Sequence, residues 1–220
     1  MRRVLIAGCS LAFLAACVNA DFMIRLGVSV SHLTGDLSKI TAGATTSGGG
    51  WSHEAAILCL TILGFVAGST AAGFFIHHPA LDFARPYGRS VISIGGLLLL
   101  SSWVTPHSIP ASCLFAASAC GLQNALATRY RGMILRTTHI TGLLTDLGQT
   151  LGMRLRGNHV ESWKITTPLL LAATFTLGAA TGTLVQLGGL APVTTACGCI
   201  YIAGGAAWSV AKRRYPGKPA

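Results

Sequence analysis

Apolar runs separated by short polar segments divide the chain and predict membrane-spanning helices. Four of these runs cover residues 4–23, 57–76, 90–105 and 109–128. A fifth run, from 166 to 211, is too long for one helix, and Gly188, Gly189 and Pro192 mark a turn within it. Because about 20 predominantly apolar residues cross the hydrocarbon core of a bilayer as a helix, the pattern predicts six spans.

The first run also resembles a secretory signal. Arg2 and Arg3 precede an apolar stretch that ends in small residues, and "LAAC", ending at Cys17, resembles a lipoprotein cleavage box. The same stretch has a counterpart in the second half of the chain, however, and a removable leader would not belong to an internal repeat. We therefore expect the run to be the first membrane helix.

Composition agrees with an integral membrane protein. Hydrophobic residues make up 51% of the chain and charged residues 10%, whereas a soluble domain carries about a quarter charged residues. The formal net charge of +10 would suggest nucleic acid in a soluble protein. Here the basic residues lie in short groups between apolar runs, so the lipid bilayer is the expected partner and nucleic acid is not.

The basic residues also predict an orientation. If both termini are cytoplasmic, all of the 16 lysines and arginines except Arg25 and Lys39 lie on the cytoplasmic side, as the positive-inside rule requires. This predicts a multi-pass protein of the inner (cytoplasmic) membrane. An eight-span alternative, in which two further polar segments cross, fits less well. The arginines that it would export are Arg85, Arg89, Arg129, Arg131 and Arg136.

One polar phrase occurs twice, as "VSHLTGDLSKI" at residues 30–40 and as "TTHITGLLTDL" at 137–147. Each copy contains His-x-Thr-Gly, beginning at His32 and at His139. Flanking stretches also correspond, "AACVNA" with "SACGLQNA" and "FVAGSTAAG" with "FTLGAATGT". The chain is therefore interpreted as a duplicated unit, with a first repeat at 1–108 and a second at 109–220 in one membrane domain.

Each unit contains three spans, and an odd number inverts the second unit relative to the first. The predicted fold is an all-α integral membrane protein with six transmembrane helices. These form two inverted three-helix repeats, each with a short re-entrant or broken Thr-Gly helix. The helix after each Thr-Gly is expected to be about ten to twelve residues long, which is too short to cross a bilayer.

The beginnings of these short helices suggest a binding site. Thr34 and Thr141 are suited to N-cap positions, and Gly35 and Gly142 allow close approach of a backbone or ligand. Two helix N-termini directed at the bilayer centre would offer N–H groups and positive dipole ends to an anion or polar solute.

Other polar residues in apolar surroundings are candidates for the same site, each with a structural alternative. Asp21 is either functional or paired with Arg25, four residues on. Asp36 is either a first-turn acid or a proton or cation ligand. Asp146 is either functional or neutralised by nearby arginines. The full set of predicted substrate- or ion-binding residues is Asp21, His32, Thr34, Gly35, Asp36, Gln123, Asn124, His139, Thr141, Gly142 and Asp146.

The two histidines and the two amides have alternatives of their own. His32 and His139 titrate near neutrality and suit proton transfer, or they cap a turn for structural reasons. Gln123 and Asn124 interrupt an apolar span and should face the protein interior. Hydrogen bonding to the Thr-Gly segment is favoured for them over contact with a ligand.

These motifs also resemble a known family. "CVNADF" followed by "VSHLTGDLSKI", and "CGLQNA" followed by "TTHITGLLTDLG", are similar to the YoaK-type bacterial membrane proteins, the family of domain of unknown function 1275. The resemblance covers nearly the whole chain. Two positions depart from the family pattern: Asn19 precedes Ala20-Asp21, and Asp36 stands where Asn is usual. The resemblance implies a multispanning inner-membrane protein of undefined activity.

No hydrolase, nucleotide-binding or zinc-protease motif is present in the sequence, so we expect no enzymatic activity, no cofactor and no metal. A small secondary transporter or channel for a small polar or anionic solute is the leading hypothesis. A membrane-embedded lipid-handling enzyme and a non-catalytic assembly partner are the alternatives. The small-residue tracks Gly64-xxx-Gly68-xxx-Ala72 and Gly178-xxx-Gly182 are expected to serve close helix packing within the chain; in the assembly-partner alternative they would instead form the interface of a homo-oligomer. Substrate, coupling ion and transport direction are not encoded in any recognisable motif.

Overall fold

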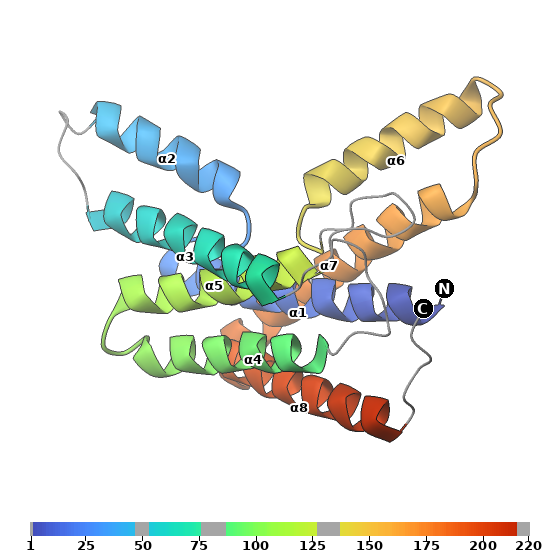
Figure 1. The fold of residues 1–220 in the computed structure, drawn as a ribbon. Helices are drawn as coiled ribbons and strands as arrows, with labels where there is room; N and C mark the ends of the chain where they lie inside the picture. Colours follow the sequence, from blue (N-terminus) through green and yellow to red (C-terminus); the bar gives the residue numbers. More distant parts are fainter. Residues whose placement is uncertain (1, 47–52, 76–86, 127–136, 215–220) are drawn as a thin grey trace.

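The computed structural model describes residues 2–46, 53–75, 87–126 and 137–214, and all regular structure within these ranges is helical (Figure 1). In chain order the helices are α1 (Arg2–Leu26), α2 (Leu33–Thr46), α3 (His53–Phe75), α4 (Tyr87–Val104), α5 (Ile109–Leu126), α6 (Ile140–Leu155), α7 (Trp163–Leu187) and α8 (Val193–Arg214). The fold expectation of an all-helical chain is confirmed. Of the arginines that bear on the orientation, 85, 129, 131 and 136 lie outside the described ranges.

Among the described residues, five helices are long and apolar enough to cross a membrane: α1, α3, α5, α7 and α8. A helix satisfies its own backbone hydrogen bonds, which lipid cannot do. The outward side chains of these helices are also apolar; Leu63, Leu177 and Leu184 are each more than 60% exposed. The sixth expected span, α4, has 18 residues with Arg89 in its first turn and is not among the five.

Helices α2 and α6 are too short to cross a bilayer. They contain 14 and 16 residues, which gives lengths of about 21 and 24 Å at the helical rise, against a hydrocarbon core of about 30 Å. Both exceed the ten to twelve residues expected from the sequence. Helix α2 packs along α3 and α6 packs along α7, and the two diverge from the rest of the bundle (Figure 1).

The centre of the bundle is formed by α1 and α5, in which residues 15–22 and 116–124 are all buried. Helix α1 packs mainly against α7, α5 packs mainly against α3, and α4 packs against α8. Each of these pairs joins a helix from the first half of the chain to one from the second half. The core therefore forms only when both halves are present.

Glycines allow these pairs to approach closely. Gly68 of α3 lies directly against the backbone of Ser118 in α5, and Gly178 of α7 lies against the backbone of Phe13 in α1. A Cβ atom at either glycine would overlap the neighbouring carbonyl oxygen. The expectation that the small-residue tracks serve close helix packing is confirmed, and these contacts lie within the chain.

Candidate functional site

The N-terminal ends of α2 and α6 point toward the middle of the molecule while their C-terminal ends lie far apart (Figure 1). His32 directly precedes α2, and His139 directly precedes α6. The two imidazoles are close enough to interact electrostatically. His32 is half-buried and packs edge-on against the Phe175 ring of α7, with 5.4 Å between ring centroids, whereas His139 is exposed. The fold thus brings together two predicted site residues from opposite halves of the chain.

Asn19 of α1 holds the segment that leads into α2. Its Oδ1 accepts hydrogen bonds from the Ser29 hydroxyl at 2.9 Å, the Val30 N–H at 3.1 Å, and the Ser31 hydroxyl and N–H at 3.0 and 3.3 Å. The Ser29 hydroxyl in turn accepts the His32 N–H at 2.9 Å. One buried amide oxygen therefore folds residues 29–31 back along α1 and places the beginning of α2.

Gln123 and Asn124 of α5 hold the segment before α6 in a similar way. The Asn124 amide donates to the Thr138 hydroxyl at 2.6 Å, and the Gln123 amide donates to the Thr137 hydroxyl at 2.9 Å. Gln123 also donates to the Leu11 carbonyl at 2.9 Å and accepts a hydrogen bond from Tyr201 of α8. Both amides face the protein interior, and their partners include the two threonines just before the His-x-Thr-Gly motif.

Asn19 is a position that the site prediction omitted. The correspondence of "AACVNA" with "SACGLQNA" pairs Asn19 with Asn124, and each of these amides binds the hydroxyl residue just before the motif histidine, Ser31 or Thr138. The repeat therefore contained the signal for Asn19, although the sequence does not show that the chain folds back onto it.

The expected N-cap role of Thr34 and Thr141 is wrong. Helix α2 begins at Leu33 and α6 at Ile140, so each threonine is the second residue of its helix, and both are exposed. The N-cap of α6 is His139, and no side-chain hydrogen bond caps that end. The helices begin earlier than expected because the preceding segments are fixed by α1 and α5 through the amides described above.

The two motif glycines have different surroundings. A Cβ at Gly142 would lie 2.5 Å from Nδ1 of His139, so only glycine leaves room for the imidazole to fold over the beginning of α6. A Cβ at Gly35 would have no heavy atom within 4 Å. Gly35 therefore borders open space beside the exposed Thr34.

The three aspartates differ in burial. Asp36 is buried in the first turn of α2. Asp21 is buried near the end of α1. Asp146 is exposed on α6, and within the described part of the chain it forms no ion pair. Asp146 lies beyond the first turn of α6, so it is not grouped with the two histidines that precede α2 and α6.

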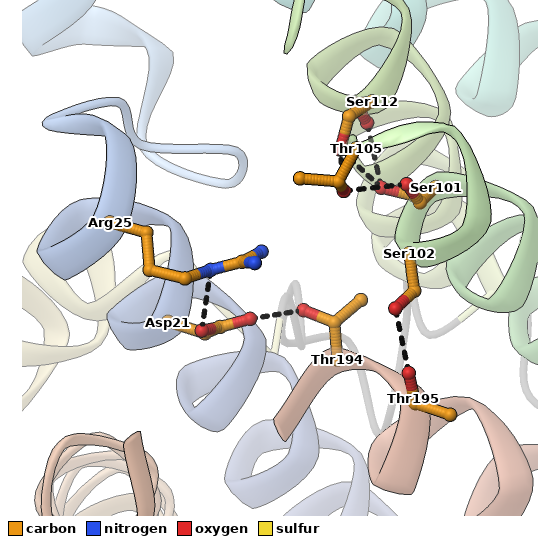
Figure 2. A network of polar contacts seen from close by, with 8 residues as sticks. All are labelled: Asp21, Arg25, Ser101, Ser102, Thr105, Ser112, Thr194 and Thr195. Atoms are coloured by element: carbon orange, nitrogen blue, oxygen red, sulfur yellow. Dashed lines mark hydrogen bonds and ion pairs between the residues drawn. The ribbon is translucent and has the colours of Figure 1, made fainter. Parts of the chain in front are cut away.

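Asp21 forms an ion pair with Arg25 within α1 and connects α1 to α8 through a hydrogen bond (Figure 2). Its Oδ1 lies 3.0 Å from Nε of Arg25, in ion-pair distance without the alignment of a hydrogen bond. Its Oδ2 accepts the Thr194 hydroxyl at 2.5 Å. Nearby, Ser101 donates to the carbonyl of Ser112 at 2.8 Å, and the Ser102 and Thr195 hydroxyls lie 2.6 Å apart. The pairing with Arg25, which was the structural alternative for Asp21, is present, and the Asp21 carboxylate is buried.

Arg25→Met is expected to destabilise the protein by about 2 kcal/mol, because it leaves the Asp21 carboxylate buried without its counter-charge. The value is below that of a fully buried pair because the Arg25 side chain is 31% exposed. Thermal unfolding in detergent, followed by tryptophan fluorescence, measures the change. In the double variant with Asp21→Asn, most of the stability should return; an equally large loss there would show that the guanidinium acts by packing.

Comparison with known proteins identifies one family. A family model described as "Protein of unknown function (DUF1275)" matches residues 7–206. No curated protein and no solved structure matches the chain.

Proposed function

The chain belongs to the DUF1275 family, and we propose that this member is a small secondary transporter or channel for a small polar or anionic solute. Its site lies between the N-terminal ends of α2 and α6. The proposed activity is passage of a solute across the bilayer without covalent chemistry.

The proposed arrangement has six spans in the inner membrane, with α4 as the sixth and both termini cytoplasmic. Support comes from the five long apolar helices and from the packing of α4 against α5 and α8 in the same bundle. The distribution of lysine and arginine favours this orientation. In this arrangement α2 and α6 extend into the membrane from opposite sides, and their N-terminal ends lie within it.

The proposed symmetry is an inverted repeat. Two sets of contacts support it. Gly68 meets Ser118 and Gly178 meets Phe13, and Phe13 and Ser118 stand equally far before Asn19 and Asn124 in the sequence. The long helix pairs likewise correspond, since α1 packs against α7 as α5 packs against α3. The glycine contacts and the helix pairs therefore both stay the same when the two halves of the chain are exchanged.

The observation that carries the proposal is the convergence of the two short helices at their N-terminal ends (Figure 1). The first N–H groups of a helix have no partner within the helix, and the dipole makes that end positive. Two such ends beside His32 and His139 suit an anion or a polar solute. Irregular backbone at this depth is tolerated where it lines a cavity, which is the usual arrangement in transporters with broken helices.

Solute flux through purified protein in liposomes tests the proposal. Swelling assays with small neutral solutes and uptake assays with formate, acetate and nitrate cover the two solute classes. Thr34→Trp and Thr141→Trp are each expected to lower flux at least about tenfold, because an indole at an exposed position beside each helix end obstructs the path.

The matched control is Thr145→Trp, which alters an exposed threonine one turn further along α6. It should retain flux near that of the wild type. Equal flux in all four proteins, with equal reconstitution, would contradict a site at the helix ends. Absence of flux for every solute in the wild type would contradict transport.

A further inference from the structure

One position of the duplicated motif differs chemically between the two halves. The residue after Thr-Gly in the second half is Leu143, the buried residue of α6, which packs with Ala12 and Leu171 in an apolar cluster. The same position in the first half is Asp36, and both side chains are 2% exposed. A carboxyl group therefore occupies the place that the other half fills with leucine.

The Asp36 carboxyl group has an unpartnered oxygen in this position. Its Oδ2 is buried and has no hydrogen-bond donor. Its neighbourhood includes the Cys113 thiol of α5, which lies within electrostatic range of Asp36 and interacts with Thr61 of α3. Cys113 and Thr61 are themselves buried. The surroundings are those of a core side chain.

The nearby cations are engaged elsewhere. Lys39, on the next turn of α2, donates from Nζ to the Gly27 carbonyl at 3.1 Å. Arg25 of α1, which is also within electrostatic range of Cys113, pairs with Asp21. On α3, which packs along α2, the charged residue Glu54 and the titratable His53 lie at its exposed N-terminal end. Within the described ranges, no ion pair reaches Asp36.

A carboxylate removed from water without a counter-charge is energetically unfavourable, and such a group binds a proton instead. Ionisable residues in membrane segments accordingly mark proton and ion pathways. Asp36 lies in the first turn of α2, beside the helix end at which the proposed solute binds. Its charge state therefore decides whether that end is net positive or is neutralised by a carboxylate.

We propose that Asp36 is a proton-binding site and that a small anion binds at the N-terminal end of α2 only when Asp36 is protonated. The inference rests on the proposed transport function for its second part. An anion and a proton then cross together, because the deprotonated carboxylate repels the anion. His32 and His139 are the other titratable groups at this site, and they stay in place in the test variants.

Proton binding is measured independently of transport by infrared spectroscopy. Difference spectra between acidic and neutral pH, recorded on the chain in lipid nanodiscs, report the carbonyl stretch of protonated carboxylic acids and are silent to histidine at that position. We expect a carboxylic acid signal that persists at pH values where an exposed aspartate is ionised. The signal should be lost in Asp36→Asn and retained in Asp146→Asn, which alters the exposed aspartate. A persistent signal that survives in Asp36→Asn, or its absence in the wild type, overturns the proton site.

Coupling is measured with formate, acetate and nitrate in proteoliposomes. An imposed inward proton gradient should raise anion uptake by about tenfold in the wild type, within the range usual for coupled binding, and leave Asp36→Asn unresponsive. Uptake that ignores the gradient in the wild type overturns the coupling and leaves transport standing. No uptake of any anion overturns coupling and counts against the proposed function, while the infrared result still decides proton binding.

Asp36→Leu controls for loss of folding, because it introduces the leucine that the second half carries at the corresponding position, Leu143. It should elute and unfold like the wild type while losing the carboxylic acid signal. If Asp36→Leu and Asp36→Asn both fail to fold, Asp36 is a structural residue and the proton site is overturned.

Discussion

Gly68→Leu is expected to abolish stable folding, at a cost of about 3 kcal/mol or more, because the contact that it disrupts is with backbone. A Cβ at this position would overlap the Ser118 carbonyl oxygen and lie 2.7 Å from the carbonyl carbon. Backbone in the middle of a buried helix cannot rotate away as a side chain can. Helices α3 and α5 would have to separate, and α5 lies at the centre of the bundle.

Gly73→Leu is the matched control, on the same helix. A Cβ at Gly73 would meet no heavy atom within 4 Å, and the position is exposed. Size-exclusion chromatography and thermal unfolding in detergent should show a folded protein for Gly73→Leu and aggregation for Gly68→Leu. Equal stability of the two variants would contradict the close α3–α5 approach.

Asn19→Leu is expected to destabilise the chain by about 3 kcal/mol, because buried donors that lose their acceptor cost about 1–3 kcal/mol each. Four hydrogen bonds from Ser29, Val30 and Ser31 end at the single Oδ1 of Asn19. The side chains are similar in volume, so lost packing contributes little. The beginning of α2 should lose its fixed position, and solute flux should fall together with stability.

Ser29→Ala is the comparison variant, because it removes only the hydrogen bonds of the Ser29 hydroxyl, to Asn19 and from the His32 N–H, and leaves the backbone bonds of Val30 and Ser31 to Asn19 intact. A loss of about 1–2 kcal/mol is expected for these two hydrogen bonds. Chemical unfolding in detergent measures both variants. A loss in Asn19→Leu no larger than that in Ser29→Ala would show that the backbone bonds do not hold the segment.

Much of the fold could be predicted from the local sequence. A long apolar run in lipid has few alternatives to a helix, because only a helix pairs its own backbone groups, and this is why the long helices were predicted at nearly their observed places. The brevity of α2 and α6 was also predictable from their polar, glycine-containing sequence. Their exact beginnings were not, because the helix start depends on hydrogen bonds from Asn19, Gln123 and Asn124, which are distant in the chain.

The candidate site, too, could be predicted from the sequence only in part. His32 and His139 were identified from the repeated motif, and the fold brings them within electrostatic range. The burial of the three aspartates could not be predicted from the sequence, since each had both a functional and a structural alternative. Burial separates them: Asp21 faces Arg25 and Thr194, Asp36 is buried without a donor at Oδ2, and Asp146 is exposed.

Hydropathy and the duplicated motif thus specify the helical elements and their polar ends, because both are properties of neighbouring residues. Which face of each short helix is buried depends instead on packing between the two halves. Asp36 shows the difference: the sequence supplies a first-turn acid, and only the packing of α2 against the bundle makes it a carboxyl group without water or a counter-charge.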